Sequence, residues 1–264
     1  MGRIIAVANQ KGGVGKTTTA INLAASLALA EQRVLGIDLD PQANFTSGLG
    51  LKGKSTEAGT IYEAITAANS ADLSAYVLEA SVRGLQLVPS DRNLTGAELE
   101  LVSMPEREHR LRELVWPLRD RYDYLFIDTP PSLGLLTLNA LVAADAVLIP
   151  IHCEYFALEG LADLIATLRR VRAAFNARLD IEGVLITMYD ERTNLGQQVA
   201  RDIRGFFKEK VFETVVPRNV RLGEAPSHGM PAILYDVKSR GAAAYLALAR
   251  EVLARQRAAT VARP

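Results

Sequence analysis

Short apolar runs alternate along the chain with longer stretches in which apolar residues recur at helical spacing. The apolar runs predict strands at 3–9, 33–40, 85–90, 124–132, 146–152 and 181–190. The stretches with helical spacing lie at 16–30, 60–68, 94–120, 134–144, 156–176, 195–209 and 239–259. Continuous apolar strands that alternate with helices are typical of a parallel sheet with both faces covered. The pattern therefore predicts an α/β fold with a mostly parallel, twisted sheet flanked by helices on both faces.

The length and composition of the chain favour one domain. It has 264 residues, of which 49% are hydrophobic and 23% are charged, so it can bury a full core. No internal repeat, low-complexity tract or linker divides the sequence. We expect residues 1–264 to form a single domain, with 260–264 as a disordered tail after the last helix.

Charge and cysteine content narrow the function classes. Thirty lysines and arginines balance thirty aspartates and glutamates, so any nucleic-acid binding has to come from a local patch. The single cysteine, Cys153, cannot supply a disulfide framework or an iron–sulfur cluster within one chain. No run of 18 apolar residues exists, and the first residues are not typical of a signal peptide. We expect a soluble, cytoplasmic protein that is not bound to a membrane.

The stretch "VANQKGGVGKTTTAINLA" at 7–24 has the character of a phosphate-binding loop but departs from the usual pattern. In G-x-x-x-x-G-K-[ST], the first glycine would stand at position 10, where this chain has Gln10. The next residue is a second lysine, Lys11, although Lys16 already occupies the place of the phosphate-binding lysine. The departure raises the question of what the second lysine does.

The remainder of the loop predicts how a nucleotide is held. Its glycines allow consecutive backbone N–H groups to point at phosphate oxygens, and the helix that starts here adds its positive end. Lys16 should reach the β- and γ-phosphates, and the hydroxyl of Thr17 should ligate Mg²⁺. The residues predicted to bind the nucleotide here are Lys11, Gly12, Gly13, Val14, Gly15, Lys16, Thr17 and Thr18.

Three aspartates stand at strand ends that should face this loop. Asp128 ends the strand "YLFID", the position at which NTPases hold magnesium, usually through water. Asp38 and Asp40 end the second strand, and their side chains point the same way because side chains alternate along a strand. Asp40 lies further toward the ligand edge, so we expect it to orient the attacking water, with Asp38 bracing the loop.

Five motifs together resemble one family. They are "KGGVGKTT" (11–18), "DLDPQ" (38–42), "FIDTPPS" (126–132), "CEYFALEGL" (153–161) and "VPRNVRLGEAPSHG" (216–229). In this order and over nearly the whole chain they resemble the ParA/Soj family of deviant Walker A P-loop ATPases, which partition bacterial chromosomes and plasmids. The resemblance implies slow, Mg²⁺-dependent ATP hydrolysis, stimulated by a ParB-type centromere-binding partner. It also implies a further link to a replication initiator.

The resemblance assigns roles to individual residues. Lys11 would cross a homodimer interface to the ATP of the other subunit, which answers the question of the second lysine, and Gly12 would have to stay small for the two subunits to meet. Asp40 would activate water, making Lys11, Lys16 and Asp40 the catalytic set. Met188, Pro217 and Asn219 would lie near the base.

The resemblance also implies binding of double-stranded DNA without sequence preference in the dimeric state. Local composition supports this modestly, since "LRRVRAAFNAR" (168–178) carries four arginines and no acid. The residues expected to contact DNA phosphates are Arg192, Arg218, Arg221, Lys238 and Arg240.

Other functions on the same scaffold make different demands. A MinD-like switch for placing the division site would need an amphipathic membrane helix at the C-terminus, and "LAREVLARQRAATVARP" lacks a bulky apolar stripe beyond Leu253. An electron carrier like nitrogenase reductase would need more cysteines than Cys153. A biosynthetic ligase would need a small-molecule pocket that the sequence does not reveal.

Overall fold

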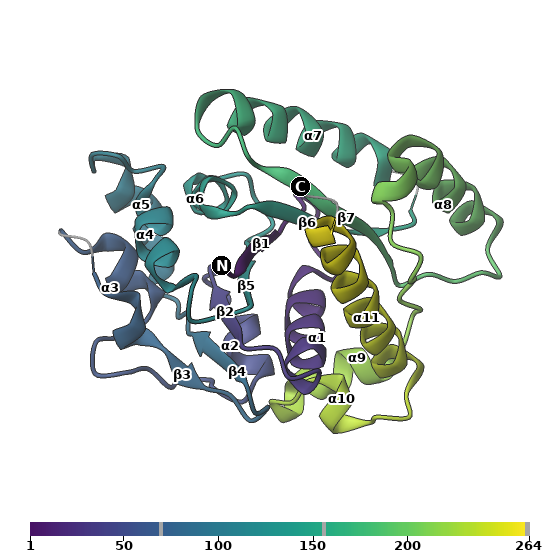
Figure 1. Ribbon diagram of the computed structural model, residues 1–264, viewed down its shortest axis with the longest axis horizontal. Helices are drawn as coiled ribbons and strands as arrows, with labels where there is room; N and C mark the ends of the chain where they lie inside the picture. Colours follow the sequence, from purple (N-terminus) through teal and green to yellow (C-terminus); the bar gives the residue numbers. More distant parts are fainter. Residues whose placement is uncertain (69–70, 155–156, 262–264) are drawn as a thin grey trace.

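The computed structural model describes residues 1–68, 71–154 and 157–261 and contains one seven-stranded sheet (Figure 1). The strand order is β3-β4-β2-β5-β1-β6-β7, and every neighbouring pair is parallel except β3 with β4. The strands are β1 (Arg3–Val7), β2 (Val34–Asp38), β3 (Leu78–Glu79), β4 (Leu85–Val88), β5 (Tyr124–Asp128), β6 (Ala146–His152) and β7 (Asp180–Thr187). The predicted α/β class is confirmed.

Helices cover both faces of the sheet (Figure 1). The α-helices are α1 (Lys16–Leu29), α2 (Asn44–Gly48), α3 (Ile61–Thr66), α4 (Leu94–Val102), α5 (Arg110–Val115), α6 (Leu135–Ala143), α7 (Ala157–Ala174), α8 (Asn194–Phe207), α9 (Val220–Glu224), α10 (Ala232–Tyr235) and α11 (Arg240–Val261). Short 3-10 segments are η1 (Leu73–Tyr76), η2 (Trp116–Leu118), η3 (Lys208–Lys210) and η4 (Ala225–His228). Within the described residues, no helix combines the length and the apolar character needed to cross a membrane.

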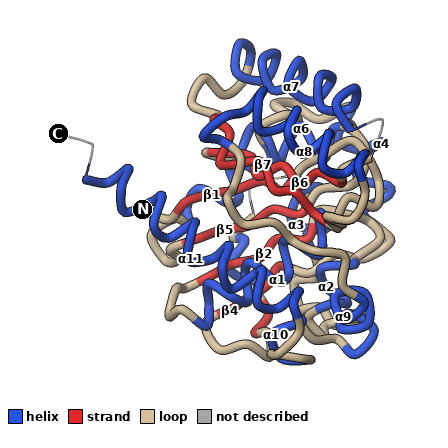
Figure 2. The backbone as a smooth tube through the Cα atoms, turned by 90° about the vertical axis from the view of Figure 1, so that its right-hand side faces the viewer, coloured by secondary structure: helices blue, strands red, loops and turns tan. Residues whose placement is uncertain are grey.

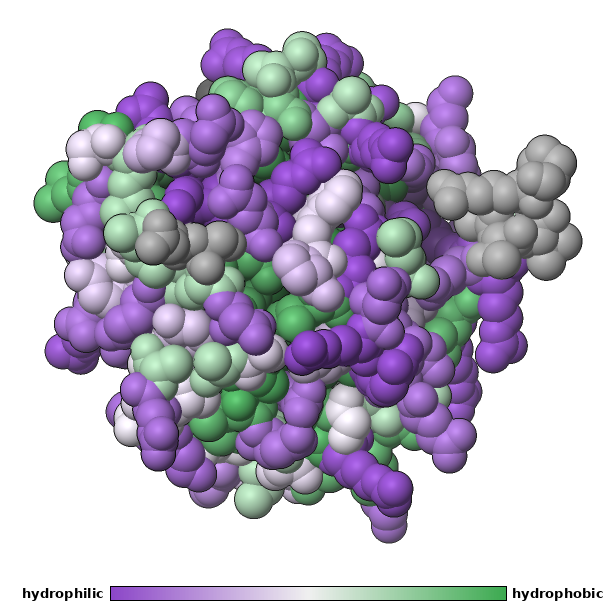
Figure 3. All heavy atoms as spheres, turned by 60° about the vertical axis from the view of Figure 1, so that its left-hand side comes forward, coloured by the Kyte–Doolittle hydropathy of each residue, from purple (hydrophilic) through white to green (hydrophobic). Residues whose placement is uncertain are grey.

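Alternation along the strands divides the core into two layers. Ile4 and Ala6 of β1 pack into the cluster on the side of α3–α8, whereas Ile5 and Val7 pack into the cluster formed with α1 and α11. All four residues are fully buried. The central strand is therefore apolar on both faces, as the continuous run at the start of the sequence predicts. By contrast, the molecular face in Figure 3 is covered mainly by hydrophilic residues, with smaller hydrophobic areas between them.

The topology gathers the functional loops at one edge. The chain leaves β1 through the glycine-rich loop and α1 and continues to β2 on one side, while β5 leads through α6 to β6 on the other side. In an open parallel sheet, ligands bind at the carboxyl ends of the strands where the winding changes direction. The glycine-rich loop lies at this position.

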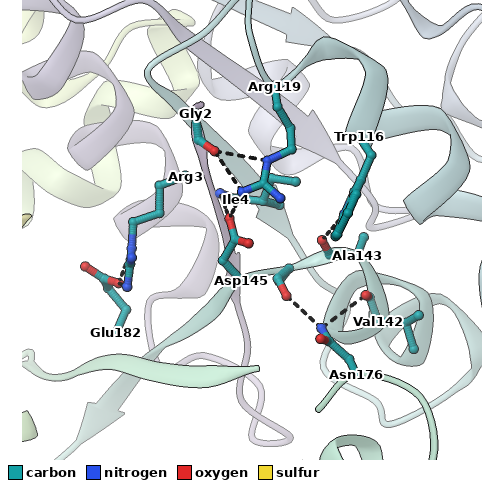
Figure 4. Close-up of polar contacts among 11 residues, drawn as sticks. Gly2, Arg3, Ile4, Trp116, Arg119, Val142, Ala143, Asp145, Asn176 and Glu182 are labelled. Carbon is teal, nitrogen blue, oxygen red and sulfur yellow. Dashed lines mark hydrogen bonds and ion pairs between the residues drawn. The ribbon is translucent and has the colours of Figure 1, made fainter. Parts of the chain in front are cut away.

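The opposite edge, at the amino ends of the strands, is closed by paired polar groups (Figure 4). Arg119 donates to a carboxylate oxygen of Asp145 at 2.7 Å and to the carbonyl of Gly2. The same oxygen of Asp145 accepts the backbone N–H of Ile4 at 2.9 Å. Asn176 donates to carbonyls at the end of α6, those of Leu141, Val142 and Ala144. Figure 2 places the start of β1 and the end of α11 on the same side of the molecule.

Several element boundaries differ from the sequence-based expectation. The predicted helix at 94–120 is two helices, because Pro105 disfavours helical geometry at the residue before it and the chain turns between α4 and α5. Strand β3 and the short helices α2, α9 and α10 have no counterpart in the prediction, since segments this short carry no readable periodicity. Helix α11 continues to Val261, and the rest of the predicted tail, 262–264, lies outside the described residues, as does the start of the predicted helix at 156.

Candidate nucleotide site at the carboxyl ends of the strands

A cavity of about 460 Å³ opens where β1, β2 and β7 end. The predicted residues that line it are Gly12, Gly13, Gly15, Lys16, Thr17, Thr18, Asp40, Met188, Pro217 and Asn219, together with Arg218 from the predicted DNA-binding set. Three residues of the predicted catalytic, nucleotide-binding and metal-binding sets do not line it, namely Lys11, Val14 and Asp128. The size suits a small-molecule ligand.

The glycine-rich loop takes a conformation that only glycine adopts easily. Gly13 and Gly15 have φ angles of 72° and 88°, in the left-handed region. The loop is held from the side by Thr187 at the end of β7, whose hydroxyl donates to the carbonyl of Val14 at 2.8 Å. Helix α1 begins at Lys16, so its free N–H groups face the cavity and favour an anion there.

Lys16 is a buried cation with little to bind in its own chain. The side chain is 93% buried, and its ammonium group donates to the carbonyl of Lys11 at a long 3.3 Å. Burial lowers the pKa of Lys16, and the charges of Asp128 and Asp40 oppose that shift. A phosphate group would supply the missing counter-charge at the position where the loop directs its N–H groups.

Asp128 lies beneath the loop as a buried carboxylate without partners. Neither of its oxygens has a hydrogen-bond partner among the described residues. Burial is the largest cause that raises the pKa of Asp128 well above its usual value, followed by the charge of Asp38, while the hydroxyl of Thr17 and the ammonium of Lys16 oppose the shift. An unsatisfied carboxylate beside a hydroxyl, below a phosphate-sized opening, fits the oxygen ligands that Mg²⁺ uses.

Asp38 and Asp40 differ in their hydrogen bonds and in their access to the cavity. Asp38 braces the loop: one oxygen accepts both the N–H and the hydroxyl of Thr46, at 2.8 and 2.7 Å, and the other accepts the N–H of Asp40. Burial raises the pKa of Asp38 to about 6. Asp40 accepts the N–H of Gln42 with one oxygen and lines the cavity.

Lys11 points away from this cavity. Its ammonium group forms an ion pair with Glu154, just after β6, with an N–O distance of 2.5 Å. Its backbone N–H donates to the side chain of Asn9, which in turn donates to the carbonyl of Pro150 in β6. Within one chain, Lys11 does not serve the pocket that Lys16 serves.

Comparison with known proteins places this site in a family. A family model described as an AAA domain matches residues 2–181, which is more than half of the chain. The chromosome partitioning protein ParA of Myxococcus xanthus is 57% identical over 255 residues, which cover 97% of this chain and 89% of that protein. The chain belongs to the ParA/Soj family.

Two further relatives support the assignment. The sporulation initiation inhibitor protein Soj of Bacillus subtilis is 53% identical to this ParA/Soj chain over 254 residues, covering 96% of this chain and 99% of that protein. The structure of cobyrinic acid a,c-diamide synthase from Mycobacterium smegmatis, solved with a bound ATP analogue and magnesium, is 34% identical. It has a TM-score of 0.84 and covers 97% of this chain and 96% of that chain.

The segment after β7 closes the far side of the cavity in this ParA/Soj chain. Met188 has a φ angle of 48°, and Tyr189 pairs with Pro217 in an isolated parallel bridge. The side chain of Asn219 caps α9 by accepting the N–H of Arg221 at 2.9 Å. Met188, Pro217 and Asn219 therefore share one wall of the cavity, as predicted, and the part they play toward a base stays a prediction.

The five predicted DNA-contacting residues of this ParA/Soj chain do not form one uniform patch. Arg192, Arg218 and Arg240 line a second cavity of about 720 Å³ beside the first. Arg192 is paired with Asp190 at 2.6 Å, and Arg221 is paired with Glu224 at 2.7 Å and with Asp236 at 3.3 Å. Lys238 does not line the cavity, and its backbone N–H donates to Asp236. Arg218 borders both cavities.

Sequence reasoning missed several residues at the site. Thr187 ends the strand β7 and Glu154 follows β6 by two residues, positions that the search for strand-end side chains could have used. Tyr245, whose hydroxyl lies 3.1 Å from that of Thr19, comes from α11, more than 200 residues further along. Its spacing gives no hint of that contact.

Proposed function

We propose that the chain is a Mg²⁺-dependent ATPase that acts as a switch in DNA segregation. The observation that carries the proposal is a pair of buried ionisable groups at the glycine-rich loop: Lys16 has one long hydrogen bond, and Asp128 has none among the described residues. Each group has the charge that one part of Mg–ATP would neutralise. The ATP analogue and magnesium named for the Mycobacterium smegmatis structure support the choice of ligand.

In this proposal the residues divide the work at the phosphates. Thr17 and Asp128 would hold Mg²⁺, which would supply neutralisation of the phosphate charge. Lys16 binds the same phosphates from the side of the loop. Asp40, at the cavity wall with one oxygen free of the Gln42 contact, orients a water molecule toward the terminal phosphorus. Few groups stabilise the transition state in one chain, so hydrolysis is slow until a partner intervenes.

A second copy completes the site in this proposal. Lys11 turns outward and would reach the ATP of the other subunit, as an arginine finger does. Gly12 supports this arrangement, because a methyl group added there would meet only Pro131, at 3.8 Å, within its own chain. Among the described residues, nothing requires a glycine at that position, whereas a closely packed second chain would.

The dimer then binds double-stranded DNA without reading its sequence. Arg192, Arg218 and Arg240 form the patch, and the dimer doubles it. With about six phosphates contacted, the logarithm of affinity should fall with the logarithm of salt concentration with a slope of about −5. A ParB-type partner stimulates hydrolysis and releases the DNA, in keeping with the chromosome partitioning names of relatives at 57% and 50% identity.

Co-sedimentation with DNA in the presence of ATP, ADP or a slowly hydrolysed analogue tests the proposal. We expect ATP-dependent binding in the wild type, a trapped DNA-bound dimer for Asp40→Ala, and no nucleotide response for Lys16→Ala. Lys11→Ala should bind ATP without forming the dimer, and Arg218→Ala should dimerise without binding DNA. Arg83→Ala is the control for Arg218→Ala, since Arg83 is an exposed arginine beside the amino end of β4.

Two outcomes would contradict the proposal. DNA retention that ignores the nucleotide in the wild type would remove the switch. Binding to anionic lipid vesicles with ATP, with no binding to DNA, would favour a MinD-like membrane function instead. Vesicle co-sedimentation is therefore run beside the DNA assay under the same nucleotide conditions.

A further inference from the structure

Glu154 is the counter-ion of the outward-pointing lysine. One of its carboxylate oxygens lies 2.5 Å from the ammonium of Lys11, and the other lies 2.9 Å from Nδ1 of His152. The hydrogen bond from Lys11 lowers the pKa of Glu154, and the charges of His152, Lys11 and Arg218 act in the same direction. The carboxylate of Glu154 thus contacts Lys11 and His152, and the charge of Arg218 acts on it as well.

The backbone around Lys11 is fixed, so its side chain is the part that can move. Asn9 ties the backbone N–H of Lys11 to β6, through hydrogen bonds of 3.0 and 2.8 Å. The side chains of Lys11 and Glu154 keep 38% and 49% of their exposure. An exposed ion pair of this kind is weak and exchanges its partners readily.

We infer that Glu154 is a positioning residue that holds Lys11 beside its own chain and must release it before the lysine reaches a second copy. The inference rests on the proposed function, which gives Lys11 its role across the dimer. A terminal phosphate carries more negative charge than a carboxylate, so it can take the ammonium over once two chains meet. Until then, Glu154 opposes dimerisation.

The test compares dimer formation by Glu154→Gln and by the wild type. Sedimentation velocity is measured over a range of protein concentrations with Mg²⁺ and a slowly hydrolysed ATP analogue. Each dimer releases two ion pairs, so removing them should lower the concentration needed for dimerisation roughly threefold to tenfold. The gap between the two proteins should shrink at high salt, because salt screens the exposed pair.

A matched control separates this effect from the loss of any surface ion pair. Lys210 and Asp180 form a pair of 2.8 Å with side-chain exposures of 37% and 55%, at the opposite edge of the sheet. Asp180→Asn should leave the dimerisation concentration within about twofold of the wild type. The thermal unfolding midpoint of nucleotide-free Glu154→Gln should match the wild type, which a purely structural role would not allow.

The outcomes for the inference and for the proposed function are distinct. A wild type that stays monomeric with the analogue overturns the proposed function and the inference with it. A wild type that dimerises while Glu154→Gln dimerises equally or less well overturns the inference alone. Weaker dimerisation of Glu154→Gln would show that the carboxylate acts within the dimer and not against it.

Discussion

The two edges of the sheet differ in how far their polar and charged groups are paired. At the amino ends, Arg119 satisfies Asp145 and the carbonyl of Gly2, and Asn176 satisfies the end of α6. At the carboxyl ends, the carboxylate of Asp128 has no partner among the described residues, and Lys16 has one long hydrogen bond. Both edges belong to the same strands and lie a few residues apart along them.

This difference distinguishes a candidate ligand site, at the carboxyl ends of the strands, from a structural region at their amino ends. An unsatisfied buried polar group costs about 1–3 kcal/mol, and more when it is charged, so a fold tolerates it where a ligand repays the cost on binding. At the amino edge, the polar groups drawn in Figure 4 are paired with one another. Substitutions at the carboxyl edge should therefore lower nucleotide binding and hydrolysis, whereas substitutions at the amino edge should lower the free energy of unfolding.

The largest effect is expected at Lys16. Lys16→Ala removes the main cation for the phosphates, and ATP hydrolysis should fall at least about a hundredfold. The nucleotide-free protein should unfold at the same temperature or higher, because the lost ammonium is buried with only one weak contact. ATPase assays and thermal unfolding without nucleotide measure both. Lys210→Ala, at the amino edge, serves as the control and should leave hydrolysis unchanged.

Asp128→Asn should also lower ATP hydrolysis without destabilising the nucleotide-free protein, and the loss of hydrolysis should be smaller than for Lys16→Ala. The amide cannot supply the negative charge for Mg²⁺, so the apparent affinity for Mg–ATP should fall about tenfold or more. The rate of ATP hydrolysis should fall by a similar factor. The free energy of unfolding without nucleotide should rise by about 1 kcal/mol or more, since an unpaired buried carboxylate is removed. A fall in that free energy would contradict the view that Asp128 is unsatisfied.

Arg119→Ala should show the reverse pattern. It leaves Asp145 without its cation and should lower the free energy of unfolding by about 2 kcal/mol, the range for a hydrogen bond to a charged group. Affinity for ATP should stay within about twofold of the wild type, because the residue lies at the far edge. Arg33→Ala is the control, since its pair with Asp123 is more exposed and should contribute less than about 1 kcal/mol. Chemical unfolding and nucleotide titration check both claims.

The sequence predicts the carboxyl edge better than the amino edge. A local motif predicts the glycines, Lys16 and Thr17, because a phosphate-binding loop needs these residue types within a few positions. The ends of predicted strands point to Asp40 and Asp128. The strands follow from continuous apolar runs, and the structure places them at nearly the predicted residues.

The missing parts are those in which distant segments meet. Asn176 reaches the end of α6 and Tyr245 reaches Thr19, contacts that the sequence does not encode by spacing. The pairing of Arg221 with Glu224 and Asp236 is likewise a result of how α9 and α10 fold back. Counting arginines along the chain does not reveal which of them are already engaged.

The last predicted effect concerns the pH dependence of stability and compares one carboxylate at each edge. Burial raises the pKa of Asp38 to about 6 from 3.8. The folded state therefore keeps this proton between about pH 4 and pH 6, where the unfolded state loses it. The contribution of Asp38 to the free energy of unfolding should fall by about 2 kcal/mol from about pH 4.5 to about pH 6.5 and then level off.

Asp123, at the start of β5, should contribute with the opposite sign. Its hydrogen bond with Arg33 lowers the pKa of Asp123, so its contribution is present above the unfolded pKa and is lost as the pH falls. Chemical unfolding of the wild type, Asp38→Asn and Asp123→Asn is measured from below the unfolded pKa of Asp123 up to about pH 6.5, so that the windows of both carboxylates are covered. Relative to the wild type, Asp38→Asn should become more stable as the pH rises and Asp123→Asn less stable. Parallel curves for the two variants would mean that the two edges do not differ in how they hold their charges.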